Sequence, residues 1–288
     1  SWPWLFAVNL PFGVLTFFLA RRYLPGNPTR VEGRRFDFPS AVLNALTFGL
    51  FIGCVEAFSH GLSFRWIVAG VVLLAGIGTV FVRRQLRQPY PMLPFDLLRI
   101  PVFSLSVLTS ILSFTSQMLG MVALPFMFHL TFGMNAAETG LLMTAWPLVI
   151  VVAGPLAGTL ATKIHPGLLG GVGLLVMSVG CFLLADVSPS VGYGGLVARL
   201  MLCGFGFGLF QSPNNHLLLS SAPSYRTGGA SGMQATARLV GQTTGAALVA
   251  LLFYLNGDRA PHAAMWLAGG FTLCGSLVSC SRLRAHRF

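Results

Sequence analysis

The run VFSLSVLTSILSFTSQMLGMVALPFMF, from Val102 to Phe128, contains no Asp, Glu, Lys or Arg. A bilayer core about 30 Å thick requires roughly 20 consecutive, mainly apolar residues in one helix. The run is long enough, and an α-helix satisfies its own backbone hydrogen bonds where water is absent. We therefore expect this stretch to cross a membrane as a helix.

Eight further apolar runs of this kind are present in the chain. The nine expected spans are Trp4–Ala20, Phe38–Phe58, Phe64–Val82, Val102–Phe128, Thr139–Thr162, Leu168–Ala185, Leu196–Ser212, Ala230–Tyr254 and Ala263–Ser281. Hydrophobic residues make up 55% of the chain and charged residues 9%, with a mean hydropathy of +0.76, which is more apolar surface than one soluble core can bury. The predicted fold class is an all-α, polytopic transmembrane helix bundle.

The basic residues give the chain a net charge of +11 and predict its orientation. They form short clusters between the apolar runs rather than one polar face, which argues against nucleic-acid binding. Basic residues near span ends stay in the cytoplasm. One side holds Arg21, Arg22, Arg30, Arg34, Arg35, Arg83, Arg84, Arg87, Arg99, Lys163, Arg226, Arg282, Arg284 and Arg287, and the other holds Arg65 and Arg259. We expect the C-terminus in the cytoplasm and residue 1 outside.

No motif for enzymatic chemistry is present in the sequence. The five Cys lie singly in or beside apolar runs, and the six His have no metal-ligand spacing. Ser-His-Asp, paired-carboxylate and nucleotide-binding Walker patterns are also missing. The sequence therefore predicts a protein that is not an enzyme, has no metal site or cofactor, and does not use ATP as its energy source.

Two stretches resemble a known family. The first is WPWLFAVNLPFG, Trp2 to Gly13, followed by an apolar run and ARRYLP, Ala20 to Pro25. The second begins with GFGFGL and continues downstream, comprising Gly204–Leu209, Pro213, Asn214, Pro223, Arg226, Gly229, Ala230, Ser231, Gly232, Arg238, Gly241 and Gly245. They resemble the sixth, twelfth and thirteenth helices of the fourteen-spanner drug:proton antiporters of the major facilitator superfamily.

The resemblance implies a major-facilitator fold that is incomplete at its N-terminus, with five preceding helices absent. Residues 1–24 would be the last helix of the N-terminal six-helix half, 36–82 two extra linker helices, 83–100 a cytoplasmic loop, and 101–288 the C-terminal half. The absent helices would account for an external residue 1 without a signal peptide, and would contain the proton-coupling groups. One departure is Thr162, which stands where the family's gating loop has an Asp.

The resemblance also implies a function, which is proton-driven export of lipophilic, often cationic, compounds across a bacterial inner membrane by alternating access. Small-molecule substrates, protons and the lipid bilayer would be the partners, and a periplasmic adaptor remains an open question. One alternative is an exporter of a single metabolite, such as a siderophore or an antibiotic. Another is a non-transporting membrane scaffold or an inert fragment.

Four polar residues inside the spans are candidates for the substrate cavity. Gln234, Arg238 and Gln242 repeat at helical spacing on one face, and an ionised group inside a span must face protein or water. The alternative for Arg238 is a structural role near the cytoplasmic end of its span. Gln117 continues a face of serines, which could instead bond their own backbone.

Two other groups of residues are expected to shape the bundle. Gln211, Pro213 and Asn214 lie at the end of the seventh expected span, where they form either a hinge or inner gate or an ordinary helix end. Small residues let membrane helices approach closely. The glycines expected at such contacts are Gly154, Gly158, Gly204, Gly208, Gly241 and Gly245.

Overall fold

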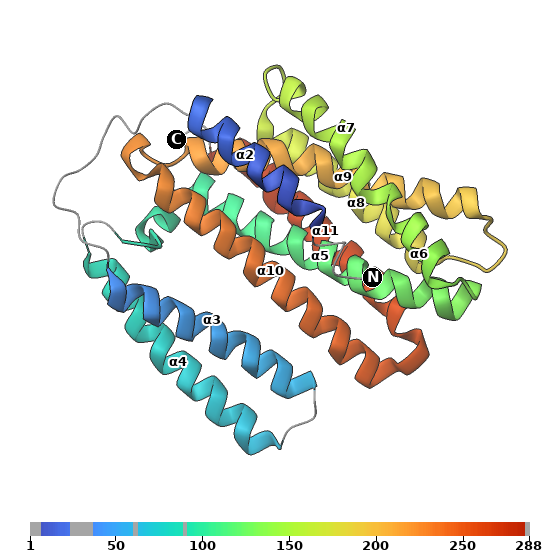
Figure 1. Cartoon of the computed structure of the whole chain (residues 1–288), viewed down its shortest axis with the longest axis horizontal. Helices are drawn as coiled ribbons and strands as arrows, with labels where there is room; N and C mark the ends of the chain where they lie inside the picture. Colours follow the sequence, from blue (N-terminus) through green and yellow to red (C-terminus); the bar gives the residue numbers. More distant parts are fainter. Residues whose placement is uncertain (1–6, 24–36, 60–62, 89–90, 286–288) are drawn as a thin grey trace. The chain divides into compact units, whose positions relative to one another are not determined.

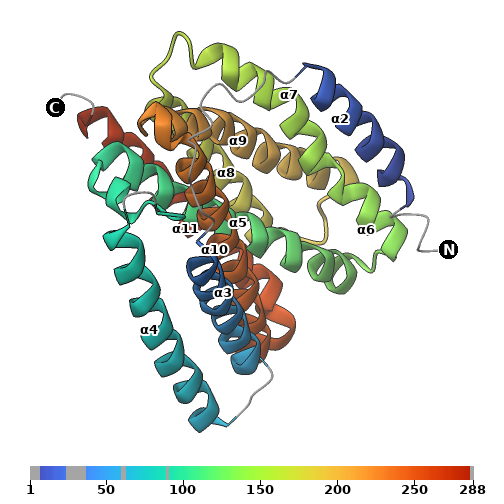
Figure 2. The same cartoon turned by 60° about the vertical axis from the view of Figure 1, so that its left-hand side comes forward.

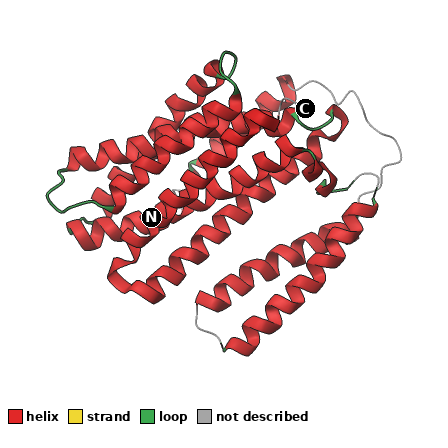
Figure 3. Ribbon diagram, turned by 180° about the vertical axis from the view of Figure 1, so that it is seen from behind, coloured by secondary structure: helices red, strands yellow, loops and turns green. Residues whose placement is uncertain are grey.

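The structure, a computed structural model, describes residues 7–23, 37–59, 63–88 and 91–285. All regular elements of this part of the chain are helices and none is a strand (Figure 3). The chain divides into two compact units, Ser1–Asp37 and Phe38–Phe288, and the described helix of the first is α2, Asn9–Tyr23. The all-α prediction is confirmed. Outside the described residues lie Trp2, Trp4, Pro25, Arg30, Arg34, Arg35 and Arg287.

The second unit contains the remaining helices. In chain order they are α3 (Phe38–Ser59), α4 (Phe64–Arg87), η1 (Phe95–Arg99), α5 (Pro101–Phe132), α6 (Ala136–Met143), α7 (Ala145–Leu160), α8 (Pro166–Ala185), α9 (Tyr193–Ser220), η2 (Ser224–Arg226), α10 (Thr227–Asn256), η3 (Gly257–Arg259) and α11 (Ala260–Ala285). The first two, α3 and α4, form a hairpin whose helices contact each other along their length (Figure 1).

The bundle is built around α5, which contacts both α10 and α11 (Figure 2). In turn α8 packs against α11 and α9, and α7 covers α9. The largest buried cluster includes Phe114, Leu174 and Phe207, while Val151 and Leu277 point outward and are about 70% exposed. Helices that are apolar on both their inner and outer faces are typical of membrane spans.

Six helical segments of the described residues are long and apolar enough to cross a membrane. They are Arg65–Arg87, Pro101–Phe132, Ala136–Leu160, Pro166–Ala185, Tyr193–Ser220 and Ser224–Leu283, the last of which runs through both α10 and α11. Residues Phe38–Cys54 of α3 are also apolar. Length and composition therefore give a polytopic bundle, as expected from the sequence.

Three interhelical hydrogen bonds join α8 to α11. The hydroxyl of Ser276 donates to the Gly171 carbonyl and that of Ser279 to the Gly167 carbonyl, each at 2.8 Å. In the opposite direction, the Ser178 hydroxyl donates to the carbonyl of Gly269 at 2.8 Å. Small residues bring two backbones within reach of such bonds in membrane helices. The pair is thus held by polar contacts as well as by packing.

The structure corrects three of the expected span boundaries. The span expected to end at Ser212 continues through Pro213 to Ser220, because a proline removes one helical hydrogen bond without preventing the following turns. The span expected over Thr139–Thr162 is two helices that meet at Thr144. The third, expected to end at Val82, continues as α4 to Arg87, so the first residues of the expected loop 83–100 are helical.

Outside the spans, one ion pair joins the segment before α5 to the turn before α10. The Arg226 guanidinium binds the Asp96 carboxylate through two nitrogens, with Nη2 to Oδ1 at 3.0 Å. This hydrogen bond holds the pKa of Asp96 below its ordinary value of 3.8. The Asp96 side chain is 43% exposed, so solvent screens the pair.

We predict that Asp96→Asn lowers the free energy of unfolding by less than about 1 kcal/mol at neutral pH. The pKa of Asp96 is lower in the folded state than in the unfolded state. Its contribution is therefore complete above the unfolded pKa of about 3.9 and is lost as pH falls through the lower, folded pKa. Thermal unfolding of the wild type and the variant between pH 3 and pH 7 tests this.

Plotted against pH, the stabilities of the wild type and of Asp96→Asn should differ by a constant amount near neutral pH and converge at the acid end. Asp186→Asn is a matched control, because Asp186 is exposed at the end of α8 and forms no ion pair with the described residues. A pH-independent difference for Asp96→Asn would contradict the assignment to this ion pair.

Candidate substrate cavity

A cavity of about 220 Å³ lies between α5, α9 and α10. It is lined by Phe114, Gln211, Asn215, Ser231, Gln234, Ala235 and Arg238. Three of the residues singled out from the sequence, Gln211, Gln234 and Arg238, thus come together in one place. Ligand pockets usually measure about 300–1,000 Å³, so this one is small for a whole drug-sized molecule.

Helical spacing explains how the polar groups converge. Gln234 and Arg238 are four residues apart on α10, and Gln211 and Asn215 are four residues apart on α9, so each pair shares a helix face. Phe114 on α5 adds an aromatic wall. The cavity therefore combines an apolar surface with amide donors and acceptors, a combination common in sites for organic ligands.

Arg238 gives the cavity its charge. Its side chain is exposed and makes no hydrogen bond or ion pair with the described residues. No acidic residue is among those that line the cavity. A guanidinium donates up to five hydrogen bonds and accepts none. The cavity as described is suited to ligand groups that accept hydrogen bonds or carry negative charge.

Gln117 and Gln242 do not line this cavity. Gln117 is three residues beyond Phe114 on α5, and Gln242 is four residues beyond Arg238 on α10, so each continues a face that begins at the cavity. Both side chains are partly exposed. The structure therefore places them on the same two faces, one helical turn further along.

Asn214 belongs to a different site from its neighbour Asn215. Its side chain is buried, its Nδ2 donates to Ser110 Oγ at 2.8 Å, and its Oδ1 accepts from Arg282 Nη1 at 2.8 Å. Pro213 is also buried, inside α9 rather than at its end. The expectation that these residues end the span is wrong, because α9 continues past Pro213 to Ser220.

Arg282 is the centre of a buried polar network that sequence reasoning missed. Its side chain is 1% exposed, and it joins α11 to α5 and α9. Its Nη1 also donates to Ser106 Oγ at 3.2 Å. Nη2 donates to Thr109 Oγ1 at 3.0 Å and to Ser279 Oγ at 2.9 Å. Arg282 therefore does not belong with the loop arginines used to predict orientation.

All of these partners are neutral. Among the described residues no carboxylate binds Arg282, and its Nε has no hydrogen-bond partner. Removing a charge from water without a counter-ion is unfavourable unless hydrogen bonds replace the lost hydration. The four hydrogen bonds that the Nη atoms donate replace part of the lost hydration. Arg282 also lies in the last turn of α11, where the helix dipole favours a positive charge.

The glycines expected at helix contacts behave in two ways. A Cβ on Gly208 would lie 2.6 Å from Ala153 Cβ on α7, and one on Gly241 would lie 2.6 Å from the Ile111 carbonyl on α5. Gly204 is similarly close to Trp146 on α7, and Gly245 is similarly close to Thr115 on α5. Gly154, in contrast, has no neighbouring atom within 4 Å of such a Cβ, and Gly158 has only Ser212 Oγ at 3.9 Å.

The expectation that Gly154 and Gly158 lie at a close helix contact is therefore wrong. Helix α7 does pack through small residues, but through different ones. The residues that α7 buries against α9 are Ala153 and Ala157, one position earlier in each case. Spacing of four residues identifies a helix face, but it does not identify which face meets the neighbour.

The sequence profile of the Major Facilitator Superfamily matches residues 1–246 and 105–286 of the chain. The chain belongs to the major facilitator superfamily. Its members are membrane transporters rather than enzymes, which agrees with the helix bundle and with a cavity between helices.

Curated relatives agree with this assignment. The uncharacterized transporter YebQ of Escherichia coli (strain K12) is 49% identical over 287 residues, covering all of the chain and 63% of the relative. The riboflavin transporter RibZ of Clostridioides difficile is 26% identical over 88% of the chain and 54% of the relative. The multidrug efflux pump LfrA of Mycolicibacterium smegmatis is 27% identical over 88% of the chain and 50% of the relative. The chain thus spans about half to two-thirds of their length.

Proposed function

We propose that the full reading frame encoding this chain is a proton-coupled exporter of lipophilic small molecules that works by alternating access. The observation that carries the proposal is the cavity between α5, α9 and α10, where apolar and amide groups surround one arginine. Transport names among the relatives, including a multidrug efflux pump, support it. With no nucleotide-binding motif in the sequence, a transmembrane gradient is the energy source that we propose.

The proposed setting is a bacterial inner membrane, with the C-terminus in the cytoplasm. The excess of Lys and Arg on one side of the expected spans supports this orientation. In the fourteen-spanner arrangement, α3 and α4 would be the two linker helices and α5 to α11 the C-terminal half. The substrate would then bind between this half and an N-terminal half that supplies the rest of the cavity.

A second candidate is export of one metabolite. It is favoured by the small volume of the cavity and by Arg238, which carries the only charge among the residues that line it. A single guanidinium suits an acceptor-rich or anionic compound better than a cationic drug. Relatives named for riboflavin transport and for cephamycin export, the latter from Amycolatopsis lactamdurans and 29% identical, are similar to this chain.

We predict that Arg238→Ala reduces efflux without reducing protein abundance, because the exposed side chain makes no hydrogen bond or ion pair with the described residues. The measurement is accumulation of ethidium, and in parallel of an anionic dye, in a pump-deficient bacterium expressing the full reading frame with and without a protonophore. Loss of one charge-assisted hydrogen bond to an anionic substrate should reduce efflux about 10-fold or more.

Arg259→Ala is the matched control, since it removes the same charge from an exposed position outside the cavity. Low dye accumulation that the protonophore abolishes would support gradient-driven export. Selective loss of anionic-dye efflux in Arg238→Ala would support the narrower candidate, and equal loss of both dyes the broader one. Accumulation of both dyes equal to that of the empty vector would contradict the broader candidate and favour either export of a single metabolite, to be sought by screening metabolites, or a non-transporting role.

A further inference from the structure

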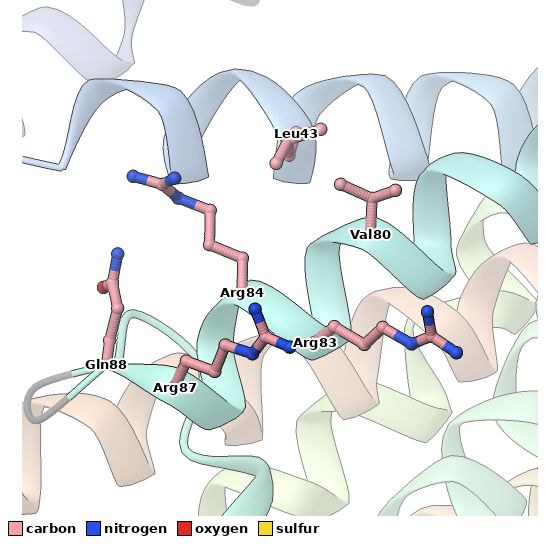
Figure 4. A pocket seen from close by; sticks show the side chains of 6 residues that line it. All are labelled: Leu43, Val80, Arg83, Arg84, Arg87 and Gln88. Carbon is pink, nitrogen blue, oxygen red and sulfur yellow. The ribbon is translucent and has the colours of Figure 1, made fainter.

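A second, larger hollow lies at the end of the α3–α4 hairpin, away from the proposed substrate cavity. It measures about 490 Å³ and is lined by Leu43 from α3 and by Val80, Arg83, Arg84, Arg87 and Gln88 from the end of α4. In Figure 4 Arg84 extends toward α3, and Leu43 and Val80 face each other between the two helices. Three guanidinium groups thus border one hollow with an apolar floor.

The three arginines are not equivalent. Arg84 is used structurally, because its Nε donates to the hydroxyl of buried Ser40 on α3 at 3.1 Å. Arg83 and Arg87 are exposed, and no hydrogen bond or ion pair to any other described residue engages them. They are four residues apart on one helix face, a spacing at which like charges repel. An anion from outside the described chain would relieve this repulsion.

The helix end that carries them is fixed in place. Gln85, on the opposite face of this turn, is buried, and its Oε1 accepts a hydrogen bond from the Leu93 backbone N–H at 3.1 Å. One turn earlier, Phe81 is 2% exposed and packs edge-to-face on Phe95. The two free guanidinium groups are therefore presented by an ordered scaffold rather than by a loop.

The surroundings indicate what kind of anion could reach the hollow. Along the rest of α4, Val71, Val72 and Leu73 are 50–66% exposed, as expected of a helix that is largely surrounded by acyl chains. Arginines at the end of such a span lie at the depth of lipid headgroups. A guanidinium binds phosphate through two parallel hydrogen bonds, which a single point charge cannot do.

We propose that this hollow binds the phosphate group of an anionic phospholipid, with Arg83 and Arg87 on the phosphate and Leu43 and Val80 against the start of an acyl chain. The volume falls within the range of about 300–1,000 Å³ typical of ligand sites. A zwitterionic lipid has the same phosphate but carries a cationic group that these arginines repel. The site therefore selects lipids by net charge.

Native mass spectrometry of the protein from the full reading frame, purified in detergent, tests the proposal. The protein is titrated separately with phosphatidylglycerol, with phosphatidylcholine of the same acyl chains, and with inorganic phosphate. Phosphatidylglycerol should bind the wild type at least 10-fold more tightly than phosphatidylcholine. Because each basic residue near an anionic headgroup contributes about fivefold in affinity, Arg83→Gln with Arg87→Gln should weaken phosphatidylglycerol binding about 30-fold.

The matched control is Arg65→Gln with Arg259→Gln, which removes two exposed positive charges away from the hollow and should leave the affinity unchanged. Equal binding of the two lipids to the wild type would overturn the proposal without reference to any variant. So would unchanged phosphatidylglycerol binding in Arg83→Gln/Arg87→Gln. If inorganic phosphate bound as tightly as phosphatidylglycerol, the site would be one for a soluble anion and the lipid assignment would be wrong.

Discussion

Replacing Arg282 by Met should lower the melting temperature of the protein by about 6–10 °C, one of the two largest stability effects that we expect from single substitutions. The substitution removes four hydrogen bonds and leaves the Asn214 side-chain carbonyl buried beside an apolar group. An unsatisfied buried acceptor costs about 1–3 kcal/mol, and the smaller side chain leaves a cavity. Together these effects amount to about 3 kcal/mol, equivalent to the expected shift for a chain of this size.

The measurement is the fraction of protein that remains monodisperse in detergent after heating. Arg259→Met changes the same residue types at an exposed position, so its melting temperature should stay within about 1 °C of the wild type. Arg282→Lys should fall between the two, because an ammonium keeps the charge but cannot reproduce the two-pronged geometry of a guanidinium. An Arg282→Met protein as stable as the wild type would mean that the network contributes nothing to folding.

The second large effect is expected at Gly206, where α8 and α9 touch through their backbones. A Cβ at this position would lie 2.5 Å from the Gly173 carbonyl oxygen and 2.9 Å from Met177 Cα. Backbone atoms cannot move aside as a flexible side chain can, so Gly206→Ala forces the two helices apart. We expect a loss of about 3 kcal/mol, at the upper end of the range for overpacked cores.

Gly154→Ala provides the matched control on α7, because no atom lies within 4 Å of the added methyl group. It should leave stability unchanged or raise it by up to about 1 kcal/mol, since Ala is the better helix former. The same heating assay reads both variants. A Gly206→Ala protein that melts with the wild type would show that α8 and α9 are further apart than described.

The sequence predicted the helices well because one physical requirement dominates them. A span needs a fixed length of apolar residues, and that length is visible in any run such as Val102–Phe128. The ends of helices were less predictable. Pro213 looked like a stop, although the helix continues to Ser220, and Val82 was followed by charged residues that remain helical to Arg87.

The candidate site could be predicted only in part, for a different reason. Periodicity put Gln234 and Arg238 on one face of α10, and Gln211 joined them once α9 was placed beside it. Arg282 could not be found in this way, because its partners lie on α5 and α9, far away in the sequence. In the sequence Arg282 is the first of three arginines in the last seven residues, and basic residues are common just beyond the end of a membrane span.

The hydrogen bonds between α8 and α11 have a consequence for the order in which the protein is made. A ribosome delivers α8 to the membrane well before α11, which is the last helix of the described chain. Until α11 arrives, the carbonyls of Gly167 and Gly171 lack their serine donors, and the polar groups of α5 and α9 that receive Arg282 lack theirs. The earlier helices therefore enter the membrane with these polar groups unpaired, and the groups are paired when α11 arrives.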